Sequence, residues 1–478
     1  MTLSAKQLGL AFGLALSASG SAAFAQDDLV TKGEYLARAG DCVACHTSNE
    51  EEPFAGGYAF KMPMGTIYSS NITPSEQYGI GTWTRDEFAK AVRKGVRPDG
   101  THLYPAMPYT AYANITDEDM DALYAYFTKG VAPVDKPLAE QTTLDFPFGL
   151  PGTMAVWNTL FANGKPFTPD SALSEEENRG KYLAEGLAHC STCHTPRNAL
   201  MAEQSGEFLA GGAVEGWYAP NITSDEVSGI GAWNKEEIVS YLKNGHAAGK
   251  AQAGGPMADA VEHSFRFLTD EDAGAIAAYL KTVPAIRDAG QTAPAYAVTK
   301  AAAVDWTAFE TTQTENDSPE HASAASDDGA MLYNVNCAAC HGISGEGSRD
   351  GYFPSLTSNT AVGAANPQNL VMAIAEGIHR EGADGKAVMP AFSEEAQVIH
   401  TGLDNAQIAA VANFVTAQFG TGSANLTGED VRVMRAGGSP SWLIANAAKL
   451  AIAGFVIGGL VVLLLLVLII RRSRRRAA

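Results

Sequence analysis

The chain has few cysteines, and a single short pattern accounts for all of them. Six cysteines in 478 residues are too few for the dense disulfide framework that stabilises small exported domains. Basic residues are also scarce, because 33 Lys and Arg stand against 53 Asp and Glu, which gives a formal net charge of −20. A protein of this sign repels phosphate groups, so the composition argues against nucleic-acid binding.

The sequence also lacks a nucleotide-binding fingerprint. No Gly-x-Gly-x-x-Gly stretch follows a predicted strand, so we expect no flavin or nicotinamide fold within this chain. Hydrophobic residues make up 46% of the chain and charged residues 18%, which is the composition of a folded protein. At roughly 100 to 200 residues per domain, the length fits about three domains.

The N-terminus has the pattern of a secretory signal peptide. Lys6 precedes an apolar run from Leu8 to Leu16, and small residues end at Ala25 before an acidic start. This run is too short to span a bilayer, so we expect residues 1–25 to be removed on export. An uncleaved N-terminal anchor is the less favoured alternative.

The C-terminus has the pattern of a transmembrane helix. Residues 450–470 carry no charge, and as a helix this stretch is about 30 Å long, which matches the hydrocarbon core of a bilayer. Arginines follow at once in the tail 471–478. The positive-inside rule places that basic tail in the cytoplasm and the body of the protein on the exported side.

Every cysteine belongs to a Cys-x-x-Cys-His element. The three elements are Cys42 to His46, Cys190 to His194, and Cys337 to His341, with second cysteines at Cys45, Cys193 and Cys340. Two thiols on one helical turn can form thioethers to the vinyl groups of a haem, while the adjacent histidine ligates the iron. One such element would leave zinc or thioredoxin-like redox chemistry open. Three elements, without further finger-like ligands or a βαβ context, predict three covalent haems c with His46, His194 and His341 as iron ligands.

An internal repeat points to the sixth ligand of each iron. Asn71-Ile72-Thr73 and a following Gly-Ile-Gly-Thr-Trp recur as Asn221-Ile222-Thr223 and Gly-Ile-Gly-Ala-Trp. Both copies continue into an amphipathic helix and then reach a methionine, Met107 in one and Met257 in the other. In the third unit, Met389 precedes Pro390. We predict Met107 and Met257 as iron ligands from their places in the repeat, and Met389 from its place before Pro390 and a capped helix. A thioether ligand favours the reduced state relative to a second imidazole, which suits an electron carrier. Histidine His102, close to Met107, is a competing candidate.

Each methionine is followed by a helix with an N-cap signal. The pairs are Thr116 with Asp119, Thr269 with Asp272, and Asp404 with Gln407. A helical run also leads into each first cysteine. The sequence therefore predicts an all-α protein of three tandem class I-like cytochrome c domains and a C-terminal transmembrane helix.

The expected domain boundaries follow from these signals. Cytochrome c domains are predicted at 26–135, 176–284 and 326–420, with linkers at 136–175 and 285–325, a juxtamembrane linker at 421–449 and the membrane helix at 450–470. The first linker contains Trp157 and the apolar stretch 146–150, so we expect it to pack between domains or on a partner. The second linker is rich in Ala, Thr, Ser and Asp, which is typical of a spacer.

The sequence resembles the three-haem cytochrome c subunit of bacterial membrane-bound dehydrogenases over nearly its whole length. The resemblance is carried by 42–46, 65–73, 104–107, 193–197 and 350–356. The C-terminal span with its terminal arginines resembles that of one subgroup of this family, the cytochrome subunits of flavin-dependent gluconate, fructose and sorbitol dehydrogenases. The resemblance implies a large FAD-dependent subunit, a small accessory subunit, ubiquinone as electron acceptor, and a bacterial inner membrane location with the haem domains in the periplasm.

Three alternatives remain at this point. The chain could serve a quinoprotein alcohol or aldehyde dehydrogenase, whose cytochrome subunit is similar. It could be a cytochrome subunit of a terminal oxidase, or an enzyme in its own right such as a haem peroxidase. A peroxidase needs an open sixth position on one iron, and the candidate methionines argue against that. We therefore expect an electron-transfer subunit that is itself non-catalytic.

Overall fold

The computed structural model describes residues 27–298, 327–396 and 402–477 of the chain. The predicted signal peptide and most of the 285–325 linker lie outside these residues. Three segments of the described chain each contain one Cys-x-x-Cys-His element, and we call them the first, second and third segments (residues 27–135, 174–286 and 327–420).

The first segment opens with a helix over residues 27–39 and closes with α5 and the π-helix η1. Thr116 caps α5, since its side chain accepts a hydrogen bond from the Asp119 amide, as predicted. The other elements of this segment, with the strand β3 that follows it, are α2 (Cys42–His46), β1 (Ala59–Met62), β2 (Gly65–Tyr68), α3 (Arg85–Lys94), α4 (Tyr109–Tyr112), α5 (Asp117–Ala125), η1 (Tyr126–Gly130) and β3 (Thr143–Leu144).

The second segment repeats this order. Ser174 and Thr269 cap its first and last helices, and Asn234 forms a complete capping box on α9. Its elements are α7 (Glu175–Tyr182), η2 (Leu183–Leu187), α8 (Ser191–His194), η3 (Ser205–Glu207), β4 (Gly212–Val214), β5 (Trp217–Ala219), α9 (Lys235–Asn244), β6 (His246–Ala247), β7 (Ala251–Gln252), α10 (Pro256–His263), η4 (Phe265–Phe267) and α11 (Asp270–Leu280).

The third segment has the same opening and closing helices around a different middle. Asp404 and Gln407 form the predicted capping box at the start of α18. Its elements, with the short helix η5 that precedes it, are η5 (Ala295–Ala297), α14 (Gly329–Asn336), α15 (Ala338–His341), α16 (Thr360–Gly363), α17 (Gln368–Glu376), β8 (Ile378–Gly382), β9 (Gly385–Met389), η6 (Glu394–Ala396) and α18 (Asn405–Phe419).

The chain is mostly helical, as predicted, but the described residues also contain four small antiparallel sheets that the expectation of an all-α fold did not include. One has the order β1-β2-β3, and the others are the pairs β4-β5, β6-β7 and β8-β9. In the β8-β9 pair, Ile378 lies opposite Met389. These strands are too short for their alternating pattern to be read from the sequence.

The first and second segments share one hydrophobic core, and the third segment has its own. Leu36 and Met120 of the first segment and Leu183 and Ile276 of the second belong to a single buried cluster. A separate cluster around Tyr333 and Ile408 forms the third core. The first two segments therefore fold against each other as one unit.

The first linker packs on this unit. Its helix α6 (Thr153–Phe161) buries Trp157 against Tyr109 of the first segment, and the indole donates to the Leu200 carbonyl of the second over 2.9 Å. Packing between the segments was one of the two expectations for this linker. In the second linker, Tyr296 lies edge-on to Trp233, so this described part is also packed.

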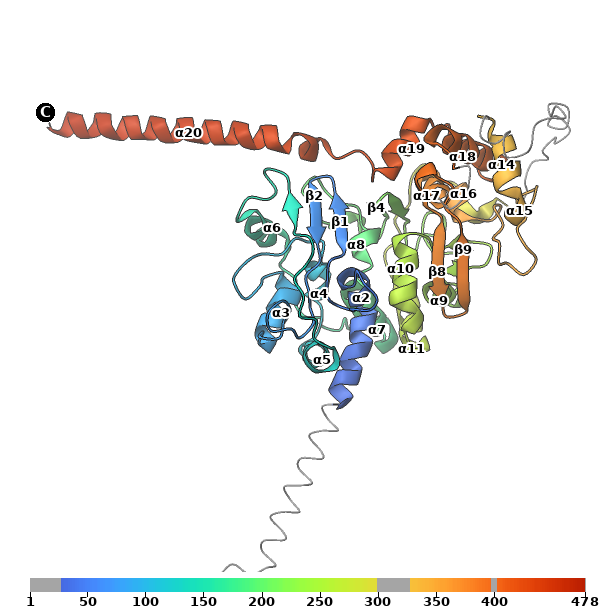
Figure 1. Ribbon diagram of the computed structural model, residues 1–478, viewed down its shortest axis with the longest axis horizontal. Helices are drawn as coiled ribbons and strands as arrows, with labels where there is room; N and C mark the ends of the chain where they lie inside the picture. Colours follow the sequence, from blue (N-terminus) through green and yellow to red (C-terminus); the bar gives the residue numbers. More distant parts are fainter. Residues whose placement is uncertain (1–26, 299–326, 397–401, 478) are drawn as a thin grey trace, which may run out of the picture.

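The C-terminal part is more helical than predicted. The juxtamembrane linker contains α19 (Gly428–Arg435), whose Val431 is fully buried, and α20 (Trp442–Ala477) begins eight residues before the predicted start at 450. No proline or glycine lies between Trp442 and Leu450 to end the helix. Figure 1 shows α20 projecting as one long helix from the side of α19.

Candidate haem sites

Each Cys-x-x-Cys-His element forms one short helical turn. The turns are α2, α8 and α15, and the structure contains no disulfide among the six thiols. Two thiols on one turn, with the histidine directly after them, present the three groups that a haem c requires on one side of the helix.

Each of the three histidines makes the same kind of hydrogen bond, from Nδ1 to a backbone carbonyl oxygen. The Nδ1 atom of His46 lies 2.7 Å from the Ser70 carbonyl oxygen, and Nδ1 of His194 lies 2.6 Å from the Pro220 carbonyl oxygen. His341 Nδ1 lies 3.0 Å from the carbonyl oxygen of Pro354. A carbonyl can only accept, so Nδ1 carries the proton and Nε2 keeps its lone pair for a metal.

Burial keeps these imidazoles neutral. It lowers the pKa of His46, His194 and His341, and the hydrogen bond to the carbonyl opposes this effect in each case. A neutral imidazole with a free Nε2 is the form that ligates iron. The donor set therefore fits a haem c at each element.

The repeated Asn-Ile-Thr sequence holds the accepting carbonyl in place. Asn71 follows Ser70, and its side chain donates to the Val134 carbonyl while it accepts from the amide and hydroxyl of Thr73. Asn221 follows Pro220 and makes the same contacts, with the Ile286 carbonyl and with Thr223. Both asparagines thus tie the histidine's acceptor to the chain after the closing helix. The third segment lacks the Asn-Ile-Thr sequence, and the carbonyl that accepts from its histidine belongs to Pro354.

Each predicted methionine packs on the same hydrophobic cluster as the first cysteine of its element. Met107 and Met257 lie against the shared core together with Cys42 and Cys190. Met389 lies against the third core together with Cys337. The competing candidate His102 differs from the histidines of the three elements, since its Nδ1 accepts a hydrogen bond from Nδ2 of Asn158 over 2.8 Å and its neutral ring therefore carries the proton on Nε2.

The first and second elements face each other across the segment interface. The hydroxyl of Tyr112 donates to the Gly40 carbonyl, two residues before Cys42, over 2.7 Å. The same ring lies edge-on to His189, the residue before Cys190, with 5.6 Å between ring centres. Burial lowers the pKa of His189 to about 4, so it is neutral at physiological pH. The sequence did not reveal this contact, because it joins residues 77 positions apart.

The described residues contain no cluster of three or more His, Cys, Asp and Glu side chains arranged to hold a metal ion. A structural zinc site would need four such ligands. Burial raises the pKa of Cys42, Cys190 and Cys337 to about 12 each, because an apolar environment disfavours the charged thiolate.

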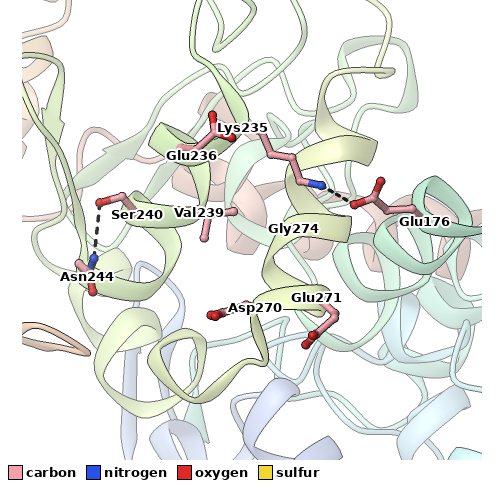
Figure 2. A pocket seen from close by; sticks show the side chains of 9 residues that line it. All are labelled: Glu176, Lys235, Glu236, Val239, Ser240, Asn244, Asp270, Glu271 and Gly274. Carbon is pink, nitrogen blue, oxygen red and sulfur yellow. Dashed lines mark hydrogen bonds and ion pairs between the residues drawn. The ribbon is translucent and has the colours of Figure 1, made fainter.

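A separate groove lies on the second segment, away from the three elements (Figure 2). Polar side chains from α7, α9 and α11 dominate it, and in it Lys235 bonds to Glu176 and Asn244 lies 3.5 Å from Ser240. The lining residues are Glu176, Lys235, Glu236, Val239, Ser240, Asn244, Asp270, Glu271 and Gly274. An apolar porphyrin would gain little from such a lining.

Comparison with known proteins identifies the family. The family model described as "Cytochrome c" matches residues 178–284 and 326–418, and that described as "Cytochrome C oxidase, cbb3-type, subunit III" matches 28–127. The fructose dehydrogenase cytochrome subunit of Gluconobacter japonicus is 43% identical, over 90% of this chain and 86% of that protein. The chain belongs to the cytochrome c subunits of bacterial membrane dehydrogenases.

Two further relatives support this assignment. The gluconate 2-dehydrogenase cytochrome c subunit of Pantoea cypripedii is 39% identical over 86% of this chain and 90% of its own. The cytochrome c subunit of the quinone alcohol dehydrogenase of Gluconacetobacter polyoxogenes is 39% identical over 92% and 90%. As a member of this family, the chain carries covalently bound haem c and transfers electrons within a dehydrogenase complex.

One described helix is long and apolar enough to cross a membrane. It covers Trp442–Arg476, and none of its most apolar stretch is buried against the rest of the protein. Its length and composition make it a candidate membrane anchor for a subunit of a membrane complex.

Proposed function

We propose that this subunit carries three haems c, one in each of three tandem cytochrome c domains at residues 26–135, 176–284 and 326–420. Each haem is attached through the cysteines of its own element. The iron ligands are His46 with Met107, His194 with Met257, and His341 with Met389. The observation that carries this proposal is the identical Nδ1-to-carbonyl hydrogen bond of the three histidines.

Bound haem c supplies a one-electron couple, and the residues of this chain hold it. The cysteines fix the macrocycle, Ser70, Pro220 and Pro354 orient the three imidazoles, and the surrounding apolar clusters exclude water. The close approach of the first two elements, through Tyr112 and His189, supports electron transfer between their haems.

The proposed electron route runs from a large FAD-dependent subunit, accompanied by a small accessory subunit, to ubiquinone. The substrate of the large subunit is a sugar or sugar acid. This part rests on the similarity to fructose and gluconate 2-dehydrogenase subunits. The haem domains lie in the periplasm and α20 crosses the inner membrane, with the arginines after residue 470 in the cytoplasm.

Purification of the complex in detergent tests this function. We expect three irons per chain, a sulfur-to-iron charge-transfer band in the near-infrared, and a large partner that releases flavin. A preparation with fewer than three irons, or with a high-spin ferric iron that binds peroxide, contradicts the proposal.

A quinoprotein partner is the second candidate, because the quinone alcohol dehydrogenase subunit is also 39% identical. The two candidates differ in the cofactor of the large subunit. Release of a quinone cofactor instead of flavin would favour the second, and copurification of copper-containing oxidase subunits would exclude both.

A further inference from the structure

The β8–β9 hairpin of the third segment lies against the second segment's methionine loop. Strand β8 packs on α10, the helix that begins at Pro256 and Met257, and Figure 1 shows the two side by side. Within the hairpin, Ile378 of β8 pairs with Met389 at the end of β9. One hairpin therefore contacts two of the three predicted methionine sites.

The contact includes Gly254, the first of two glycines that lead into α10. A Cβ atom at Gly254 would lie 3.0 Å from the Trp217 ring on one side and 3.4 Å from Ile378 Cδ1 on the other. Gly255 has a φ of +52° and lies even closer to Trp217, where a Cβ would come within 2.3 Å. The start of the loop thus lies close to a ring of its own segment and, at Gly254, to a side chain of the third segment.

Arg380 of β8 makes hydrogen bonds to the second segment's methionine loop. Its side chain is only 4% exposed, and Nη1 donates to the Ala253 carbonyl over 2.9 Å while Nη2 donates to Gln252 Oε1 over 3.1 Å. The stem of the side chain covers Gly245, where a Cβ would lie 2.1 Å from Arg380 Cδ. Both hydrogen bonds fix the residues just before Gly254.

The positive charge of Arg380 has no close counter-ion among the described residues. Among the described residues, no carboxylate lies within 4 Å of its guanidinium. The nearby Asp384 is bonded to His246 at 2.8 Å. Burial lowers the pKa of Arg380, although Tyr241 and Asp384 oppose this effect, and a guanidinium stays charged nonetheless.

In the first segment, a tyrosine and not an arginine covers the glycine that corresponds to Gly245. There the ring of Tyr109, two residues after Met107, covers Gly95, where a Cβ would lie 2.6 Å from it. In the second segment the residue two after Met257 is Asp259, and Arg380 of the third segment covers the corresponding Gly245. The glycine of the first segment is therefore covered by a side chain of its own segment, whereas the glycine of the second segment is covered by a side chain of the third.

We propose that Arg380 is a positioning residue for Met257, and that its charge raises the reduction potential of the iron in the second domain. A buried cation near the iron disfavours the more positive, oxidised state. Loss of the two loop hydrogen bonds loosens the approach of the methionine sulfur. The inference rests on the proposed function, since it takes Met257 as the sixth ligand.

The test compares four variants of the full-length chain with its haems attached. Arg380→Gln removes the charge, and Arg380→Lys keeps a charge but loses the fork of two donors. Lys386→Gln removes an exposed charge from the same hairpin, and Arg266→Gln breaks the 2.6 Å ion pair to Glu381 across the same interface. The measurements are iron content, the sulfur-to-iron charge-transfer band and the three midpoint potentials.

We expect Arg380→Gln to retain three haems, to lower one of the three midpoint potentials and to weaken the band by up to one third. Arg380→Lys should show a smaller potential shift, and both control variants should match the wild type. Unchanged potentials and band in Arg380→Gln would overturn the inference, as would an equal shift in Arg266→Gln.

If Arg380→Gln does not assemble, Arg380→Lys decides, because an unaltered band in that variant contradicts a positioning role. The proposed function fails separately. A wild-type protein without the band, or with fewer than three irons, removes the basis of both proposals, whereas a normal wild type with a normal Arg380→Gln removes only this one.

Discussion

Asp119 and Asp272 each accept a hydrogen bond from a tyrosine of the other segment. Tyr182 donates to Asp119 over 2.6 Å, and Tyr35 donates to Asp272 over 2.5 Å. Arg179 adds two hydrogen bonds of 2.7 Å each to Asp272. Both carboxylates are 7% exposed, so these hydrogen bonds replace contacts with water that burial removes. The reciprocal pairs join the first two segments at their closing helices.

Asp272 predicts a loss of stability in acid. Burial raises the pKa of its carboxyl, but the hydrogen bonds from Arg179 and Tyr35 outweigh burial and leave the pKa below its usual value. A depressed pKa stabilises the fold above the unfolded-state pKa of about 3.9, and this stabilisation is lost as the pH falls through the lower folded-state value. We expect Asp272→Asn to lower the free energy of unfolding at neutral pH by about 1–3 kcal/mol.

The same variant should lose part of the acid dependence, because its side chain no longer titrates. Urea unfolding of the haem-loaded protein at a series of pH values from neutral to about 3 measures both effects. Asp270→Asn is the matched control, since Asp270 lies on the same helix with its side chain 83% exposed and paired with Lys243. An acid dependence in Asp272→Asn equal to that of the wild type would contradict the prediction.

The opening and closing helices of the first two segments cross at glycines. A Cβ at Gly33 would lie 2.0 Å from the Ala122 carbonyl oxygen, and one at Gly180 would lie 1.9 Å from that of Ala275. Such distances require the two backbones to separate. The crossings therefore set how closely the opening and closing helices of each segment pack.

Gly180→Ala is expected to destabilise the protein although alanine is the better helix former. Relief of the clash should cost about 1–3 kcal/mol or more, against a gain of about 1 kcal/mol in helix propensity. Gly274→Ala is the control, because it lies in α11 near the same crossing and its Cβ would meet the flexible ends of two side chains, Lys235 at 3.1 Å and Glu176 at 3.9 Å, and no backbone atom in that range. Thermal unfolding should rank the variants as Gly274→Ala, wild type and Gly180→Ala in falling stability. Equal melting temperatures for the two variants would contradict this account.

The sequence predicted the elements whose signals are local. The structure confirms the N-caps at Thr116, Thr269 and Asp404 and the amphipathic helices α3 and α9. It also confirms that the three Cys-x-x-Cys-His elements are helical turns. Each depends on residues within about four positions of one another. Such features can be predicted because the residues that form them are close in sequence, whatever the rest of the chain does.

The sequence could not predict contacts made by distant residues. Arg380 lies 127 positions from the Ala253 carbonyl that it binds, and nothing in its neighbourhood separates it from an exposed arginine. The same holds for the Tyr35 and Asp272 pair, 237 positions apart. Their places follow from how the segments pack, which periodicity and composition do not encode. The ligand roles of Met107, Met257 and Met389 stay predictions.

At the scale of the whole molecule, the described residues include a fused pair of segments, a third segment and the long exposed helix α20. The pair shares one core, and the contacts of the third segment with the pair include those of β8, those of Arg380 and the ion pair of Arg266 with Glu381. Helix α19 completes the third core through Val431. The described residues of both cores therefore precede α20 in the chain, and α20 contributes no residue to either core.

This arrangement predicts that the chain can be separated from the membrane without loss of its haems. A chain that ends at Ser439 keeps α19 and both cores but lacks Trp442–Arg476. Expressed without its partners, it should leave the membrane fraction and enter the soluble fraction, because an apolar helix of this length is what holds the protein in the bilayer. Its iron content and absorption spectrum should equal those of the full-length chain, and the full-length chain expressed alone is the control. If the shortened chain still sediments with membranes after a high-salt wash, then the body itself binds the bilayer and α20 is not the only anchor.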